Sequence, residues 1–64
     1  MVDIGSQIVF YRKANGMTQE QLAEKSGVLV QQVSRYERGL QMPSVKQLKK
    51  IADALEISIN YLCD

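Results

Sequence analysis

The chain contains no histidine and a single cysteine, Cys63, among its 64 residues. One cysteine cannot form an intramolecular disulfide, and without histidine there is neither a Cys/His zinc site nor a side chain that titrates near neutral pH. Phosphate-binding glycine loops and a recognisable pair of catalytic carboxylates are also missing. We therefore expect no enzymatic activity, metal, cofactor or small-molecule ligand, and we interpret Cys63 as a packing or surface residue.

Long hydrophobic runs are missing as well. The longest, from Ile8 to Tyr11, is far too short to cross a membrane or to form the core of a signal peptide. A cytoplasmic location without membrane contact is expected. The content of 45% hydrophobic and 23% charged residues fits one globular domain over residues 1–64. The net charge is only +1, so binding to a nucleic acid would depend on where individual cations lie.

Residues 17–39, MTQEQLAEKSGVLVQQVSRYERG, predict two short helices joined by a tight turn. Thr18 and Gln21 form the T-x-x-Q pattern of a capping box, which starts a helix over Gln19–Ser26. Gly27 ends that helix, because glycine readily adopts a positive φ.

The next helix, from about Leu29 to Arg38, has two different faces. On a wheel of about 100° per residue with Val30 at 0°, polar side chains fill an arc from about 40° to 140°, and apolar ones lie at roughly 240° to 300°. The polar arc contains Ser34, Arg38, Gln31 and Arg35, and the apolar arc contains Leu29, Val33 and Tyr36. One face is expected to pack against the protein and the other to present hydrogen-bonding groups with two positive charges.

The pattern T-Q-x-x-L-A-x-x-x-G-V, followed by S-R-Y-E-R-G, resembles the helix-turn-helix of the lambda-repressor-like, Cro/XRE family. The resemblance extends from Ile4 to Leu62 and implies an all-α, compact five-helix domain whose second and third helices form the motif. It also implies a sequence-specific DNA-binding transcriptional regulator, a repressor that binds an inverted-repeat operator in double-stranded DNA through the major groove. The alternative is a protein-interaction module or antitoxin-like adaptor on the same fold, favoured by apolar residues such as Phe10 and by the modest net charge.

The resemblance also implies which residues contact DNA. Base contacts are expected from Val30, Gln31, Ser34 and Arg35, and backbone contacts from Thr18, Gln19, Arg38 and Gln41. Val30 stands where relatives usually carry a polar residue, although its methyl groups could contact the C5-methyl of thymine. Leu29 stands at the usual serine or threonine N-cap, and leucine cannot cap a helix. Relatives pair the residues that match Arg12 and Glu37, which predicts a partly buried ion pair between the first and third helices.

The first helix is expected from about Ile4 to Asn15, after a frayed lead of residues 1–3. Its apolar residues Ile4, Ile8 and Tyr11 share one side and should face the core, whereas Phe10 should be exposed. The fourth helix, Val45–Leu55, follows an S-x-x-Q capping box of Ser44 and Gln47. Its expected buried face consists of Val45, Leu48, Ile51, Ala52 and Leu55.

A last short helix opens at Ser58 in a segment rich in apolar residues. This density, at Ile57, Ile59, Tyr61, Leu62 and Cys63, is more than one small domain is expected to bury. We therefore predict a homodimer interface formed by Ile57, Ile59, Tyr61 and Leu62. Pairing there would place two recognition helices one DNA turn apart, roughly 34 Å.

Overall fold

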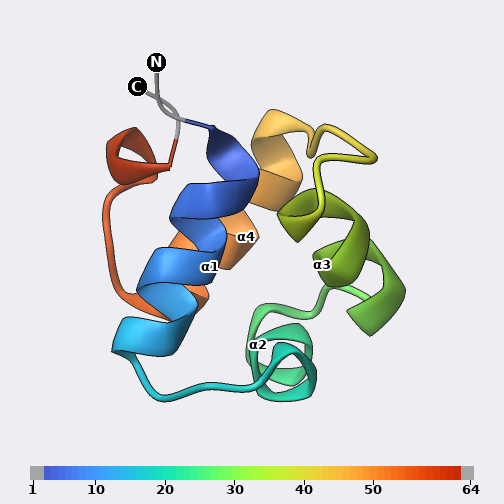
Figure 1. Ribbon diagram of the computed structural model, residues 1–64. Coiled ribbons are helices and arrows are strands. Elements are labelled where there is room, and N and C mark those ends of the chain that lie inside the picture. Colours follow the sequence, from blue (N-terminus) through green and yellow to red (C-terminus); the bar gives the residue numbers. More distant parts are fainter. Residues whose placement is uncertain (1–2, 63–64) are drawn as a thin grey trace.

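The computed structural model describes residues 3–62, so Cys63 lies outside the described residues. Its elements are α1 (Ile4–Ala14), α2 (Gln19–Ser26), α3 (Val30–Glu37), α4 (Val45–Leu55) and a 3-10 turn, η1 (Ile59–Tyr61). In Figure 1, α1 crosses in front of α4, while α2 and α3 lie to one side of this pair and η1 to the other. The predicted all-α fold is confirmed, with a single 3-10 turn in place of a fifth α-helix. No helix in the described part of the chain is long and apolar enough to span a membrane.

Both ends of α2 are built as the sequence predicts. The Thr18 N–H donates to Oε1 of Gln21 at 2.8 Å, and the Gln21 N–H donates to Oγ1 of Thr18 at 3.1 Å, which completes the capping box. Gly27 closes α2 with φ of 78°, in the left-handed region. Val28 then enters the core between the two helices.

Two predicted helix starts differ from the structure. Asp3 is not frayed: it is the N-cap of α1, and its carboxylate accepts hydrogen bonds from the N–H and the hydroxyl of Ser6. The capping box at α4 is only half formed, because the Gln47 N–H donates to the Ser44 hydroxyl but no bond returns. The Gln47 Oε1 atom is instead buried and has no hydrogen-bond partner among the described residues.

The core draws apolar side chains from all four helices and from the segments that join them. Its buried members are Ile8, Leu22, Ala23, Val28, Val33, Tyr36, Leu48, Ile51, Ala52, Ala54, Leu55 and Leu62. Ile4 and Tyr11 pack against it, and Phe10 is exposed, both as predicted.

Three apolar residues were placed wrongly by the sequence patterns. Leu29 is 65% exposed, because it is an extended N-cap residue and does not follow the helical wheel. Val45 is 75% exposed, because the side chain of a first helical residue points beyond the start of its helix. Leu62 is completely buried, so it cannot form a dimer interface. The segment before it folds back onto α1, where Nε2 of Gln7 donates to the Tyr61 carbonyl at 3.0 Å.

Gly5 marks a close approach of α1 to the end of α3 that the sequence patterns did not reveal. A Cβ atom at this buried position would lie 2.5 Å from the Tyr36 carbonyl oxygen and 2.8 Å from that of Glu37. Because both atoms belong to the backbone, only glycine fits without moving one of the helices. This close approach restricts the position of α3 relative to α1.

Candidate nucleic-acid interface

An open depression lies between the first turn of α2 and the outward face of α3. Its lining consists of Gln19, Val30, Gln31, Ser34, Arg35 and Arg38. All six belong to the eight residues predicted to contact DNA. We call this surface the interface groove. Of the other two, Thr18 is the N-cap of α2, directly before Gln19, and Gln41 is exposed in the loop between α3 and α4.

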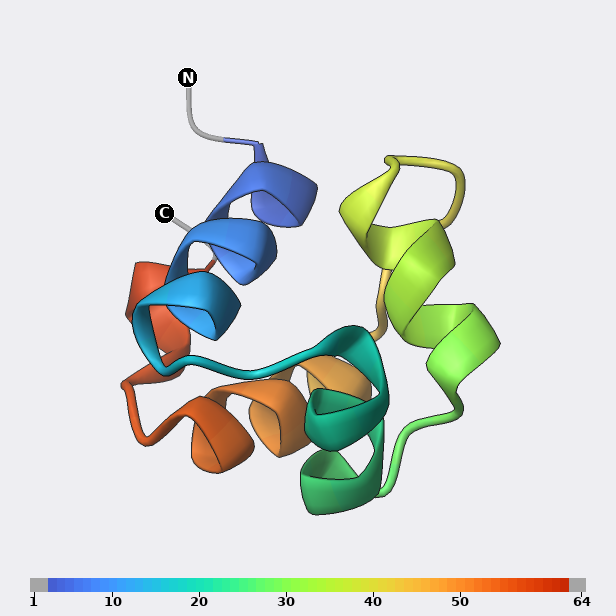
Figure 2. The same cartoon turned by 60° about the horizontal axis from the view of Figure 1, so that its bottom comes forward.

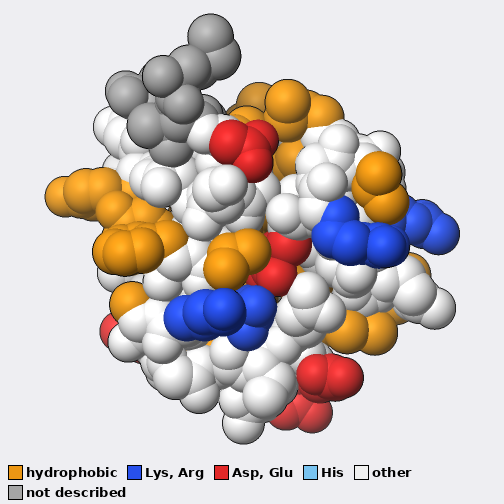
Figure 3. Space-filling view, in the orientation of Figure 1, with side chains coloured by type: hydrophobic (Ala, Val, Ile, Leu, Met, Phe, Trp, Pro, Cys, Tyr) orange, Lys and Arg blue, Asp and Glu red, His pale blue; other side chains and the backbone are white. Residues whose placement is uncertain are grey.

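The interface groove carries positive charge at the carboxyl-terminal half of α3. Arg35 lies in the last turn and Arg38 follows as the C-cap residue, and both side chains are exposed. Figure 3 shows lysine and arginine side chains over α3, at the right of the view. The acidic residue of this helix, Glu37, forms an ion pair with Arg12 of α1, and the positive charge of Arg12 offsets its negative charge.

The predicted pair of Arg12 and Glu37 is present and largely buried. Nε of Arg12 lies 2.6 Å from Oε2 of Glu37, and Nη2 lies 3.1 Å from Oε1, which is a two-pronged contact. The two side chains are 11% and 5% exposed. The remaining guanidinium nitrogen, Nη1, donates to the Met17 carbonyl at 2.8 Å. One arginine therefore joins α1, the segment before α2, and α3.

Gln19 belongs to the same network, which the sequence reasoning missed. Its Nε2 donates to Oε1 of Glu37 at 2.9 Å. A carboxylate can only accept, so the amide must turn its nitrogen toward Glu37, and its orientation is fixed. The same nitrogen carries a second N–H group, which this bond does not use. No local pattern could have revealed this bond, because it joins the first residue of α2 to the last residue of α3.

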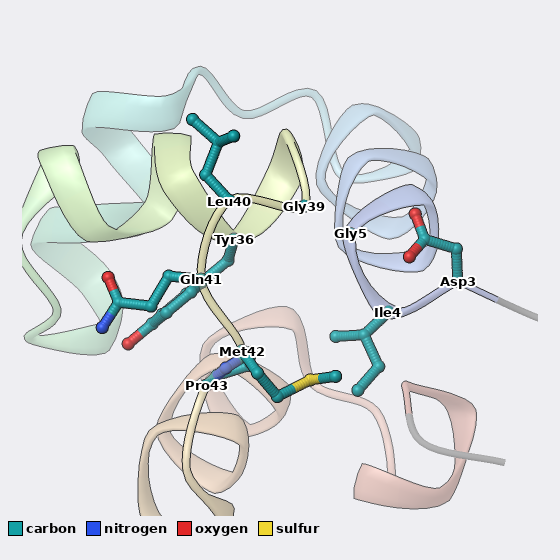
Figure 4. A pocket seen from close by; sticks show the side chains of 9 residues that line it. All are labelled: Asp3, Ile4, Gly5, Tyr36, Gly39, Leu40, Gln41, Met42 and Pro43. Carbon is teal, nitrogen blue, oxygen red and sulfur yellow. The ribbon is translucent and has the colours of Figure 1, made fainter.

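A second hollow separates the start of α1 from the loop after α3. Its lining consists of Asp3, Ile4, Gly5, Tyr36, Gly39, Leu40, Gln41, Met42 and Pro43. Figure 4 shows the Ile4 and Met42 side chains pointing toward each other, whereas Gln41 points away from α1. The carboxylate of Asp3 is occupied in capping α1. This hollow therefore gathers no set of polar groups that could bind a ligand.

The chain matches the family described as Helix-turn-helix, HTH_3, over residues 10–62. It belongs to this helix-turn-helix family. The lambda-repressor-like, Cro/XRE assignment made from the sequence pattern is thereby confirmed.

Relatives of known role match most of this chain. The cryptic phage CTXphi transcriptional repressor RstR of Vibrio cholerae is 43% identical over 60 residues, which is 94% of this chain and 54% of that protein. The transcriptional regulator SinR of Bacillus subtilis is 42% identical over 62 residues, 95% of this chain and 56% of that protein. The chain thus spans about half the length of the curated relatives it matches. Both relatives are transcriptional regulators, in agreement with the expectation that this chain is not an enzyme.

Solved structures share the fold closely. SinR in complex with DNA aligns with a TM-score of 0.92 at 42% identity, covering 95% of this chain and 98% of that one. The restriction-modification controller protein C.AhdI from Aeromonas hydrophila aligns with a TM-score of 0.91 at 36% identity, covering 95% and 92%. These similarities confirm the compact lambda-repressor-like architecture.

Proposed function

We propose that this chain is the DNA-binding domain of a transcriptional repressor, and that it occupies an inverted-repeat operator with α3 in the major groove. The observation that carries this proposal is the interface groove, where six of the predicted DNA-contacting residues meet on one surface. The close structural match to SinR, whose structure was solved with DNA, supports it. A regulator of this kind would work in the cytoplasm, where bacterial DNA lies.

Base recognition would come from the outward face of α3. The exposed side-chain amide of Gln31 can form two hydrogen bonds with the edge of adenine, donating one to N7 and accepting one from the N6 amino group. Because this pairing matches adenine, it would give Gln31 a sequence preference. The guanidinium of Arg35 can donate two hydrogen bonds to a guanine edge. Ser34, one turn after Val30, is short enough to let α3 approach the base pairs closely.

Contacts with the DNA backbone would fix the position of α3. The first turn of α2 begins directly after the N-cap Thr18, and the N–H groups of a first helical turn, which the helix itself does not bond, favour a phosphate. Arg38 and Gln41 would bind the backbone beyond the end of α3. Because the net charge is only +1, these few local contacts must supply the electrostatic attraction.

Selection of bound duplexes from a random DNA pool would test this function. We expect an enriched inverted repeat, with an affinity that falls steeply as the salt concentration rises. Absence of salt-sensitive DNA binding, together with a stable complex with another protein, would instead establish the interaction-module alternative.

We further propose that two copies pair through the carboxyl-terminal end. With Leu62 in the core, the available surface centres on Tyr61, which is 56% exposed, beside the partly buried Ile57 and Ile59. The Tyr61 ring contacts Tyr11 edge-on, with centroids 6.0 Å apart. An amphipathic aromatic surface of this kind suits a small contact between identical subunits.

Sedimentation with and without a two-half-site duplex would test the pairing. Tyr61→Glu should abolish cooperative binding to two half-sites and leave the affinity for one half-site intact. Tyr61 is a better target than Ile59, since aspartate at the partly buried Ile59 would also disturb the core. A single wild-type copy bound to each complete operator would disprove the dimer.

A further inference from the structure

The loop between α3 and α4 carries a methionine that solvent reaches easily. Figure 2 shows this loop, in yellow, as an arch beyond the carboxyl-terminal end of α3. The Met42 side chain is 73% exposed, whereas Met17 is partly buried and packs against the core. Peroxides convert a methionine thioether into a sulfoxide, so Met42 is the more accessible target of the two.

Met42 also approaches α1 with the apolar end of its side chain. Its side chain and that of Ile4 point toward each other across the hollow that both residues line (Figure 4). Ile4 itself packs against the core. The surroundings that Met42 meets at α1 are therefore apolar.

Few other interactions hold this part of the loop. The Leu40 N–H donates to a carbonyl of α3 at 2.9 Å, and the buried Pro43 fixes the other end. Between them, Gln41 and Met42 form no hydrogen bond within the described residues. The apolar approach of Met42 to Ile4 is thus what restrains the position of Gln41.

We propose that Met42 is a site of reversible oxidation by peroxides, and that its sulfoxide releases Gln41 from the DNA backbone. The proposal rests on the proposed function, in which Gln41 binds that backbone. In the reaction, the thioether sulfur attacks one peroxide oxygen, the O–O bond breaks and an S–O bond forms. The sulfur loses two electrons. The other oxygen takes the proton and leaves as water or an alcohol.

The sulfoxide differs from the thioether in polarity. Its S–O group is poorly accommodated beside the methyl groups of Ile4, so oxidised Met42 turns toward solvent. Gln41 precedes it directly and thereby loses its fixed position relative to α3. The interface groove contains neither residue, so the preference for bases persists while attraction to the DNA backbone weakens.

Peroxide treatment of the chain tests this site, with Cys63→Ser in every protein to remove the thiol. Mass spectrometry of peptides should find the added oxygen on Met42 at a lower peroxide concentration than on Met17. The affinity for a duplex selected from a random pool should fall about fivefold, the value of one hydrogen bond of ordinary strength. Methionine sulfoxide reductases should restore it.

Variants then locate the effect on the protein. Met42→Leu should bind DNA like the wild type before and after peroxide, because leucine is similar in volume and has no sulfur. Met42→Gln, which places an uncharged polar group there, should bind about fivefold more weakly without peroxide. Met17→Leu is the matched control and should lose as much affinity on oxidation as the wild type does.

The position of the oxidised side chain can be measured without DNA. A nuclear Overhauser effect between the methyl groups of Met42 and Ile4 should be present in the untreated chain and lost after oxidation. Its persistence in the sulfoxide form would overturn the proposal, and so would an equal loss of affinity in Met42→Leu and the wild type. Failure of the untreated chain to bind any duplex in a salt-sensitive manner would instead overturn the proposed function.

Discussion

Gln19 and Glu37, the first residue of α2 and the last residue of α3, are joined by a hydrogen bond of 2.9 Å. The carboxylate that binds Arg12 in the interior thus also orients an amide at the edge of the interface groove. A residue without direct access to DNA is thereby linked to one proposed to contact a phosphate.

A double-mutant cycle would measure this link. Gln19→Ala alone should weaken operator binding by about 1 kcal/mol, the usual value of one hydrogen bond. In a Glu37→Gln background, where the amide at position 19 is less firmly oriented, the same change should cost less, with a coupling energy of about 0.5 kcal/mol or more. The cycle requires the affinity of one selected duplex for four proteins: the wild type, the two single variants and the double variant. Additive losses of binding free energy would show that Glu37 does not position Gln19.

Removing one partner of the buried ion pair should destabilise the fold strongly. Glu37→Ala leaves the Arg12 guanidinium largely buried without its acceptor, which should lower the free energy of unfolding by about 3–5 kcal/mol. The double variant Arg12→Met/Glu37→Leu should lose much less, because no charge remains buried. Urea unfolding measures both.

An exposed ion pair provides the control for that measurement. Nζ of Lys25 lies 3.3 Å from Oε2 of Glu56, and the two side chains are 47% and 76% exposed. Lys25→Ala should change stability by less than about 1 kcal/mol. A comparable loss at both pairs would mean that burial does not set the strength of the Arg12–Glu37 contact.

The sequence predicted those parts of the fold that depend on local signals or on the family pattern. The Thr18 capping box and the Gly27 turn are set by a few neighbouring residues, and the Arg12–Glu37 pair followed from resemblance. Positions that depend on where elements meet were missed or wrong. The burial of Leu62 requires η1 to fold back onto α1, and nothing in a short segment specifies that docking.

Single substitutions in and beyond α3 should separate base recognition from backbone attraction. Gln31→Ala should relax the preference at one base position, with a loss of about 1–3 kcal/mol on the preferred site. Arg38→Ala should weaken binding to all sequences about equally and reduce the salt slope by about one. Affinities across a site library at several salt concentrations test both. An unchanged base preference in Gln31→Ala would show that this residue does not contact a base edge.

Two glycines should respond differently to added side chains. Gly5→Ala should lower the free energy of unfolding by about 1–2 kcal/mol, since crowding against the α3 backbone exceeds the gain in helix propensity. At Gly27 the space is open, and only the left-handed backbone opposes a side chain. Asparagine, which tolerates that conformation, should be nearly neutral at Gly27 and damaging at Gly5. Equal effects in thermal unfolding would show that α1 and α3 can separate freely.

The three contacts of the Arg12 guanidinium also bear on motion. They hold the Met17 carbonyl just before α2 and both carboxylate oxygens at the end of α3. Neither helix can separate from α1 unless these hydrogen bonds break, and separation would also expose the core side chains of both helices to water. The backbone amides that form hydrogen bonds within α2 and α3 should therefore exchange with deuterium at the same slow rate as those within α4, through opening of the whole domain. Under the proposed function, the chain would therefore meet DNA with the interface groove already in place.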